Sequence, residues 1–327
     1  MIRIPFSEPN LGYKEKEYVN QALASGWVGS KGDFIDKFEQ KFAKYIGVHH
    51  AITCSSGTAA LFLAYIACGM KQDSKIITTQ ETFAATYNMA LTISRNVQMI
   101  KPNSDTWNLN PVPVDNCNYF IGVHLYGNPL DMGALYKTKY AFIEDCAQAL
   151  GSTFKGKKVG SFGAASCFSF HSAKTITTGE GGMVCTNDKE IADRVRHVKN
   201  QCMTEPYKHD NLGWNFRMTN LQAALGLAQL ERIDELLDRK KEISKRYNED
   251  LCDKYKRQQD TRNSNVVKWA NAYSNPYASL LREKLKLAGI DTRPGFNRED
   301  VIVLPSGTTL TQADQNYIIE VANESVA

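Results

Sequence analysis

The stretch Ser169-Phe-His-Ser-Ala-Lys174-Thr-Ile-Thr-Thr-Gly-Glu-Gly-Gly182 places one lysine just before a run of small residues and glycines. An amine that is buried among small groups, with few carboxylates nearby, loses its proton more readily than a solvated amine. A neutral amine can attack a carbonyl carbon and form a Schiff base. The stretch would also suit a surface lysine in a glycine-rich hairpin, so the interpretation of Lys174 depends on the rest of the chain.

Around this stretch, short apolar segments with the character of buried strands alternate with segments of helical periodicity. The expected strands are residues 48–54, 75–78, 97–100, 119–124, 140–143, 166–170 and 182–186. This alternation predicts an α/β domain with a mostly parallel sheet. Lys174 then lies in the loop between the last two strands.

A capping box, Thr219-Asn-Leu-Gln222, predicts the start of a long helix. The charged run Arg239-Lys240-Lys241 within it predicts a solvated helix face. We expect this helix to lead from a large domain, residues 1–238, into a smaller C-terminal α+β domain, residues 239–327. Two more helices are expected between about residues 12 and 45.

Composition narrows the class of protein. The chain has 327 residues, 43% of them hydrophobic, and a net charge of +4 from interspersed charges, so we expect neither a nucleic-acid surface nor a membrane span. None of the 8 cysteines forms a C-x-x-C pair, so a zinc knuckle, a redox dithiol or another metal site is not expected. The first residues lack the apolar core of a signal peptide, and we expect a cytoplasmic protein with reduced cysteines.

Two further segments suggest ligand binding. Ser55-Ser56-Gly57-Thr58 follows an expected strand and opens a helix, where free backbone N–H groups attract a phosphate; a simple N-cap is the alternative. Glu144-Asp145 ends another expected strand, at the sheet edge where open α/β folds bind ligands. A carboxylate there can keep a ring nitrogen protonated, although Asp145 could instead cap a helix.

The loop His209–Met218, which is polar and aromatic, comes just before the capped helix and is either a binding loop or an ordinary helix entry. A phosphate cup, a carboxylate and a Schiff-base lysine, in this order, describe a site for pyridoxal 5'-phosphate (PLP). The cofactor needs an anchor for its phosphate, a negative partner for its pyridine nitrogen and an amine for its aldehyde.

The chain resembles the PLP-dependent nucleotide-sugar aminotransferases of the DegT/DnrJ type. The motifs that carry this resemblance are residues 56–61, 124–132, 144–148, 169–182 and 215–224. It implies PLP fold type I, the fold of aspartate aminotransferase, and a homodimer with shared active sites. The most similar subgroup, the perosamine and viosamine synthases, implies transfer of an amino group from L-glutamate to a nucleotide-linked 4-keto-6-deoxy sugar, giving a 4-amino-4,6-dideoxy sugar nucleotide.

The resemblance also implies roles for individual residues. Lys174 corresponds to the Schiff-base lysine, and Asn215 to a phosphate ligand from the other subunit. The other implied cofactor ligands are Gly57, Thr58, Phe83, Asp145, Gln148 and Ser169. Arg217 and Arg293 are basic residues that could meet the substrate's diphosphate, or could pair with surface carboxylates.

The chain departs from the family pattern in one place. After Pro294 the family continues through a segment with proline and histidine, whereas here only residues 295–303 precede Leu304. We therefore expect a shortened C-terminal domain, and the alternative function is a pseudo-enzyme or regulator that keeps the PLP fold. An amino-acid lyase is disfavoured by residues 177–182 and 215–224, and a Rossmann-type binder by the lack of a G-x-G-x-x-G motif after the first strand.

Overall fold

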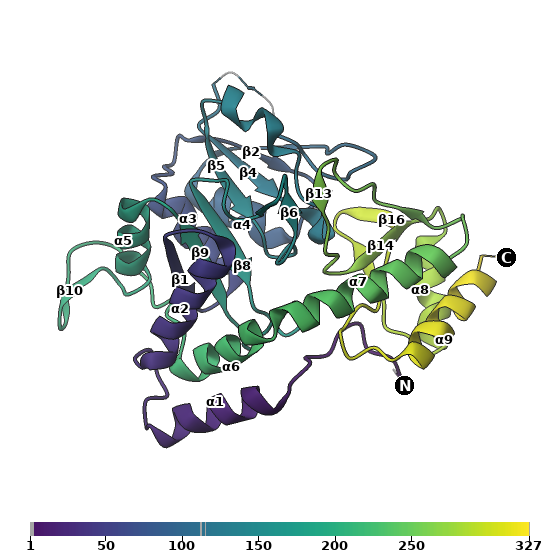
Figure 1. Cartoon of the computed structure of the whole chain (residues 1–327). Coiled ribbons are helices and arrows are strands. Elements are labelled where there is room, and N and C mark those ends of the chain that lie inside the picture. The colour runs from purple at the N-terminus through teal and green to yellow at the C-terminus, as the bar shows by residue number, and fades with distance from the viewer. Residues whose placement is uncertain (1–2, 112, 115, 327) are drawn as a thin grey trace.

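A seven-stranded sheet forms the centre of the larger part of the protein (Figure 1). The computed structural model describes residues 3–111, 113–114 and 116–326. The strand order is β1-β9-β8-β5-β4-β2-β3. The strands are β1 (His50–Cys54), β2 (Lys75–Thr79), β3 (Asn96–Ile100), β4 (Tyr119–Val123), β5 (Ala141–Asp145), β8 (Ala165–Ser169) and β9 (Gly182–Thr186).

The sheet is mostly parallel, as the sequence predicts. Neighbouring strands from β8 to β3 pair in parallel, while β9 pairs antiparallel with both β1 and β8. The segment that joins β8 to the reversed strand β9 is the loop that carries Lys174. That loop therefore leaves the sheet at the edge where the parallel strands end.

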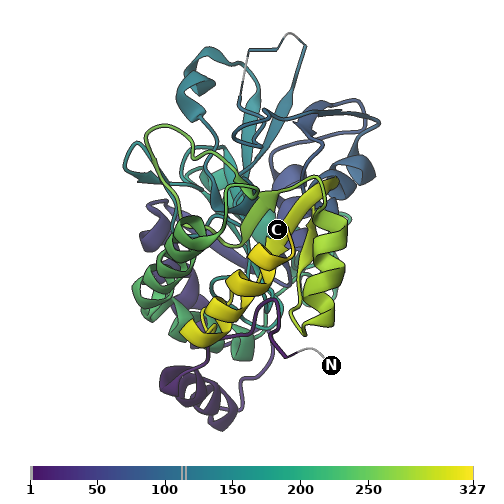
Figure 2. The same ribbon diagram turned by 90° about the vertical axis from the view of Figure 1, so that its right-hand side faces the viewer.

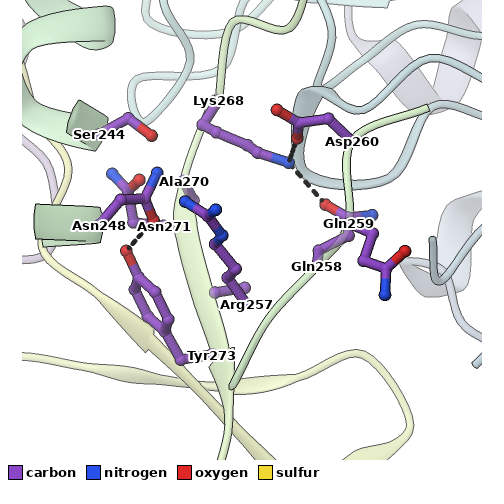
Figure 3. Close-up of a pocket in the computed structure, with 11 residues that line it drawn as sticks. Ser244, Asn248, Arg257, Gln258, Gln259, Asp260, Lys268, Ala270, Asn271 and Tyr273 are labelled. Atoms are coloured by element: carbon purple, nitrogen blue, oxygen red, sulfur yellow. Dashed lines mark hydrogen bonds and ion pairs between the residues drawn. The ribbon is translucent and has the colours of Figure 1, made fainter. Parts of the chain in front are cut away.

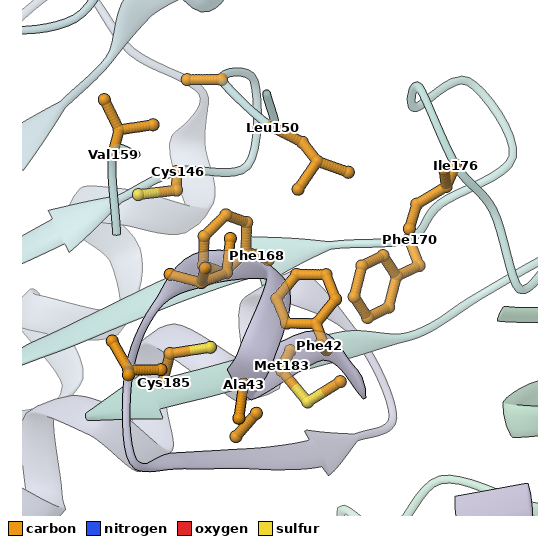
Figure 4. Close-up of a cluster of buried hydrophobic side chains, with 14 of the residues drawn as sticks. Phe42, Ala43, Cys146, Leu150, Val159, Phe168, Phe170, Ile176, Met183 and Cys185 are labelled. Carbon is orange, nitrogen blue, oxygen red and sulfur yellow. The ribbon is translucent and has the colours of Figure 1, made fainter. Parts of the chain in front are cut away.

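Helices cover both faces of this sheet. One face packs against α3 (Gly57–Ala67), α4 (Ala84–Ile93) and α5 (Lys189–Val198), and the other against α2 (Asp33–Ile46) and α6 (Asn220–Glu231). On α2, apolar side chains one turn apart face the sheet; Figure 4 shows Phe42 between Phe168 and Phe170, with ring centroids 5.1 and 5.4 Å away.

Alternation along β5 decides which side chains reach which face. Ile143 belongs to the core beneath α3, whereas Phe142 belongs to the core beneath α2. Because side chains alternate along a strand, Asp145 lies on the α3 side and Glu144 on the α2 side. Two adjacent carboxylates are thereby separated by the sheet.

The predicted capping box is present: the Thr219 and Gln222 side chains bond each other's backbone N–H groups at the start of α6. The expected long helix, however, is two helices, α6 and α7 (Ile233–Asp250), with Arg232 between them. The predicted solvated face is wrong for Lys240, which is only 2% exposed. α7 turns this position toward the loops beneath the C-terminal sheet rather than toward water.

A four-stranded antiparallel sheet, in the order β12-β14-β16-β15, lies in the C-terminal part. Figure 2 shows α7, α9 and α8 side by side there. A separate hydrophobic core packs between these elements. They are β12 (Lys256–Arg257), β14 (Asn271–Ser274), α8 (Ala278–Leu287), β15 (Arg293–Gly295), β16 (Arg298–Leu304) and α9 (Gln312–Glu324).

The N-terminal residues also pack on this C-terminal part. Ile4 bridges to Ile290, and its side chain belongs to the C-terminal core. The predicted domain boundary at residue 238 falls inside α7 and stays a prediction. Among the described residues, no helix combines the length and apolar character needed to span a bilayer.

The remaining elements are one helix and several short segments. They are α1 (Tyr13–Ala24), the 3₁₀ helices η1 (Leu125–Gly127) and η2 (Met132–Lys137), the sheet of β6 (Thr153–Phe154), β7 (Lys157–Lys158) and β13 (Ser264–Asn265), and the hairpin of β10 (Met203–Glu205) and β11 (Lys208–His209).

Candidate active site

A pocket of about 620 Å³ opens at the carboxyl ends of the parallel strands. This is the edge where open α/β sheets bind ligands, because strand ends and helix starts meet there. Eight of the ten predicted site residues line it: Gly57, Thr58, Phe83, Asp145, Gln148, Ser169, Lys174 and Arg293.

The Lys174 amine lies inside this pocket, against an aromatic ring. Its Nζ is 4.1 Å from the ring centroid of Trp269, and the Trp269 indole N–H donates a 2.7 Å hydrogen bond to the carbonyl of Ala173. Burial lowers the pKa of Lys174 from 10.5 to about 8, while the charge of Asp145 acts in the opposite direction. A substantial fraction of the amine is therefore neutral near physiological pH, as nucleophilic chemistry requires.

Two donors hold the Asp145 carboxylate at the end of β5. Oδ2 accepts a 2.7 Å hydrogen bond from the hydroxyl of Thr86 on α4, and Oδ1 accepts a 3.1 Å bond from the backbone N–H of Ala147. Burial raises the pKa of Asp145, while these hydrogen bonds and the charge of Lys174 oppose the rise. No helix starts directly after Asp145, since the next described element is β6, so its predicted alternative role as a helix cap does not apply.

The start of α3 forms a cradle with free donors. Ser56 caps the helix by accepting from the N–H of Ala59 at 3.1 Å, which leaves the N–H groups of Gly57 and Thr58 without an acceptor among the described residues. A Cβ on Gly57 would lie 2.7 Å from the Cβ of Ser169, too close for any larger residue. The end of β8 and the start of α3 thus approach closely enough to enclose an anion.

Aromatic side chains form another wall of the pocket. Phe83 is 58% exposed, and its ring lies 6.1 Å from that of Phe296, at the turn between β15 and β16. Phe296 stacks on Tyr126 at 5.4 Å, and the Tyr126 backbone N–H donates to Oε1 of Gln148 at 2.8 Å. Tyr126, Trp269 and Phe296 were not predicted as site residues, because no local sequence pattern distinguishes a wall aromatic from a core aromatic.

These groups fit PLP on physical grounds. The unpaired N–H groups at the α3 start offer donors to a phosphate, Asp145 offers an acceptor to a ring N–H, and Lys174 offers an amine of lowered pKa. The exposed ring of Phe83 offers a face on which an aromatic ring can stack.

Comparison with known proteins agrees with this chemistry. The model of the DegT/DnrJ/EryC1/StrS aminotransferase family matches residues 9–300. The chain belongs to this family. PLP is its cofactor, and the predicted fold type I is confirmed.

Two GDP-perosamine synthases are among this aminotransferase's relatives. That of Escherichia coli O157:H7 is 38% identical over 99% of both chains, and that of Vibrio cholerae is 39% identical over 76% of this chain and 71% of its own. The first alignment spans 359 positions, 32 more than this chain has residues, so the chain lacks segments that the relative has.

Solved structures share the fold along nearly the whole length. The aminotransferase DesV of S. venezuelae has a TM-score of 0.91 at 25% identity, covering 99% of this chain and 98% of its own. The aminotransferase TlmJ of Streptoalloteichus hindustanus has a TM-score of 0.92 at 22% identity, covering 100% and 99%.

The two remaining predicted positions, Asn215 and Arg217, and the rim residue Arg293 differ in their surroundings. Arg293 lines the pocket and also bonds the carboxylate of Asp291, while its contact with the substrate's diphosphate stays a prediction. Asn215 and Arg217 lie outside the lining of the pocket. Asn215 is exposed, and Arg217 donates to Oδ1 of Asn200. The expectation that Asn215 serves the other subunit stays a prediction.

A second cavity, of about 250 Å³, lies between α7 and strands β12 and β14. Figure 3 shows Lys268 reaching Asp260 and Gln258 there, each at 3.0 Å, and Tyr273 reaching Asn248 at 3.1 Å. It contains none of the predicted site residues.

The His124, Glu144 and Cys146 side chains are close enough to hold a metal ion. Both ring nitrogens of His124 already have partners, however: Nδ1 accepts from the N–H of Leu130 at 3.0 Å, so Nε2 carries the proton that faces Glu144 at 3.1 Å. Glu144 also accepts from the N–H groups of Gly160, Phe162 and Gly163, each at 2.8 Å. His124 and Glu144 therefore belong to a buried hydrogen-bond network with a structural role.

Proposed function

We propose that this aminotransferase moves an amino group from L-glutamate to C4 of a nucleotide-linked 4-keto-6-deoxy sugar. The product is a 4-amino-4,6-dideoxy sugar nucleotide. The observation that carries the proposal is the pocket. It brings together a lysine of lowered pKa, a buried carboxylate and the N–H groups at the start of α3 that have no acceptor among the described residues. The substrate class is supported by the relative named GDP-perosamine synthase, which is similar over 99% of both chains.

The residues of the pocket have distinct tasks in this reaction. PLP, when bound, supplies an electron sink that lets an amino group and a carbonyl oxygen exchange places. Lys174 holds the cofactor's aldehyde carbon, and its freed Nζ accepts a proton from the donor's α-carbon. In the second half of the cycle, the same Nζ returns a proton to C4 of the sugar.

The other groups bind and orient. Asp145 accepts a hydrogen bond from the pyridine nitrogen and favours its protonated state. The N–H groups of Gly57 and Thr58, with the Ser169 hydroxyl, hold the phosphate. Gln148 contacts the phenolic oxygen and Phe83 stacks on the ring. Arg293, at the rim, meets the diphosphate of the substrate.

The first test is the visible absorbance of the purified protein. L-glutamate is expected to bleach the yellow band of bound PLP, and a 4-keto-6-deoxy sugar nucleotide is expected to restore it. Lys174→Ala should abolish both changes while the protein remains folded. A band that ignores every amino donor would favour the pseudo-enzyme alternative, and no band after PLP is supplied would refute the cofactor site.

The proposal includes a homodimer in which Asn215 completes the partner's phosphate site. Complementation tests this directly: Lys174→Ala and Asn215→Ala are each expected to be impaired, and a mixture that exchanges subunits is expected to regain activity. In the mixed dimer, one site contains both wild-type residues. Failure to regain activity after demonstrated exchange would show that each site is built from one subunit.

A further inference from the structure

Lys240 is a buried amine without a counter-ion. Its side chain is only 2% exposed, and it makes no ion pair with any carboxylate among the described residues. Its Nζ donates instead to two carbonyl oxygens, that of Trp269 at 2.8 Å and that of Ser306 at 2.6 Å. A charge buried in this way is unfavourable unless something in the structure compensates for it.

The number of partners matches the neutral amine. An ammonium group has three N–H donors, whereas a neutral amine has two, and two carbonyls are present. Burial, and secondly the charge of Lys174, lower the pKa of Lys240 to about 7. The basic neighbours on the same helix turn away: Arg239 pairs with Glu242, and Lys241 with Asp238.

Trp269 connects this amine to the active site. Its carbonyl accepts from Lys240, its backbone N–H donates to the carbonyl of Tyr126 at 3.1 Å, and its indole N–H donates to the carbonyl of Ala173 at 2.7 Å. The face of the same ring lies 4.1 Å from Nζ of Lys174. The indole thus fixes both the backbone before Lys174 and the side chain of Lys174 itself.

The second carbonyl anchors Lys240 from the other side. Ser306 follows β16, its N–H donates to the carbonyl of Phe6 at 3.0 Å, and its hydroxyl accepts from Asn271 at 3.0 Å. Phe6 packs edge-on to Trp269 at 6.1 Å and lines the pocket. Lys240 therefore joins the segment that carries Trp269 to the segment that carries Ser306.

We propose that Lys240 is a positioning residue for Lys174 and acts through Trp269. This inference rests on the role proposed above for Lys174. Loss of the Lys240 amine would release the Trp269 carbonyl, let the indole move and admit water beside Lys174. Because burial is what lowers the pKa of Lys174, entry of water beside its amine would raise that pKa.

The test measures the reactivity of Lys174 in the full-length protein after PLP is removed. The rate of labelling by an amine reagent is followed against pH and assigned to Lys174 by peptide mass spectrometry. In Lys240→Met, labelling at pH 7.5 is expected to fall about threefold or more, as a higher pKa leaves less neutral amine. Lys240→Gln keeps a donor for the Trp269 carbonyl. The decrease in the logarithm of its Lys174 labelling rate should therefore be less than half of that in Lys240→Met.

Lys241→Met is the matched control, because Lys241 is the next residue on the helix and is exposed. Its Lys174 profile should equal that of the wild type. An unchanged profile in Lys240→Met, or in Lys240→Leu if the methionine variant does not fold, would overturn the proposal, as would an equal change in Lys241→Met. The labelling rate needs neither cofactor nor substrate. It can therefore be measured even if the proposed reaction does not occur, and failure of this inference can be distinguished from failure of the proposed function.

Discussion

The hydroxyl of Thr86 donates a 2.7 Å hydrogen bond to Oδ2 of Asp145, which joins helix α4 to the end of strand β5. Thr86 is fully buried, and its oxygen also lies 2.8 Å from the hydroxyl of Thr82. Since the single proton of Thr86 points to Asp145, Thr82 donates to Thr86. A short relay of hydroxyl groups thus orients the carboxylate that faces the pocket.

Replacing Thr86 with valine should weaken cofactor binding. The isosteric change removes the donor, and a hydrogen bond to a charged group contributes about 1.5–3 kcal/mol, so PLP affinity should fall about tenfold or more. Titration of the apoprotein with PLP, followed by absorbance, measures the effect. Thr92→Val on the same helix is the control, because the Thr92 hydroxyl bonds only the Met89 carbonyl among the residues that the structure describes. Equal affinities in the two variants would contradict the assigned role of Thr86.

Gly57→Ala should disturb the phosphate cradle. The new Cβ would lie 2.7 Å from the Cβ of Ser169, so the start of α3 and the end of β8 must move apart. We expect PLP affinity to fall about tenfold, since overpacking typically costs about 1–3 kcal/mol. Gly29→Ala, at a position with nothing within 4 Å of the added Cβ, is the control. The same PLP titration applies, and unchanged binding in Gly57→Ala would place the phosphate elsewhere.

Glu144→Gln should destabilise the fold without touching the pocket. The fully buried carboxylate accepts four hydrogen bonds, from His124 and from the backbone at 160, 162 and 163, and an amide nitrogen would oppose some of these donors. We expect the free energy of unfolding to fall by about 3–5 kcal/mol, as for a broken buried pair. Urea unfolding measures the loss of stability. Glu190→Gln, the same substitution at an exposed residue, is the control. A loss below about 1 kcal/mol would show that the network is dispensable.

The stability of the apoprotein should rise between pH 7 and pH 8. Lys240 and Lys174 have pKa values of about 7 and about 8 in the native state, against 10.5 ordinarily. In this window the unfolded chain binds more protons than the native one, so the free energy of unfolding increases with pH. Lys240 alone should contribute about 1 kcal/mol, which Lys240→Met should remove.

Urea unfolding at pH 7, 7.5 and 8 tests this dependence. The series stops at pH 8 because burial raises the pKa of the Cys167 and Cys185 thiols, which opposes the trend at higher pH. Identical slopes for the wild type and Lys240→Met would mean that the buried amine keeps an ordinary pKa.

Local patterns were sufficient for most of the fold. The seven expected strands of the large sheet are all present, with ends that differ by at most two residues, because short apolar runs between turn residues have few other ways to be buried. The break at Arg232 was missed, since apolar spacing continues through it and only packing reveals the change of direction. Lys240 was misplaced for a related reason: a lysine among charged neighbours carries no local sign of burial.

The sequence by itself determined the chemistry: a lysine after β8, a carboxylate ending β5 and a glycine opening α3, each placed at a strand end by the hydrophobic pattern. Parallel pairing then brings these ends to one edge. Only the tertiary structure decided how that chemistry is tuned. Thr86, Trp269 and Lys240 come from separate segments, and their effects on Asp145 and Lys174 depend on hydrogen bonds and on exclusion of water, which arise only when those segments pack together.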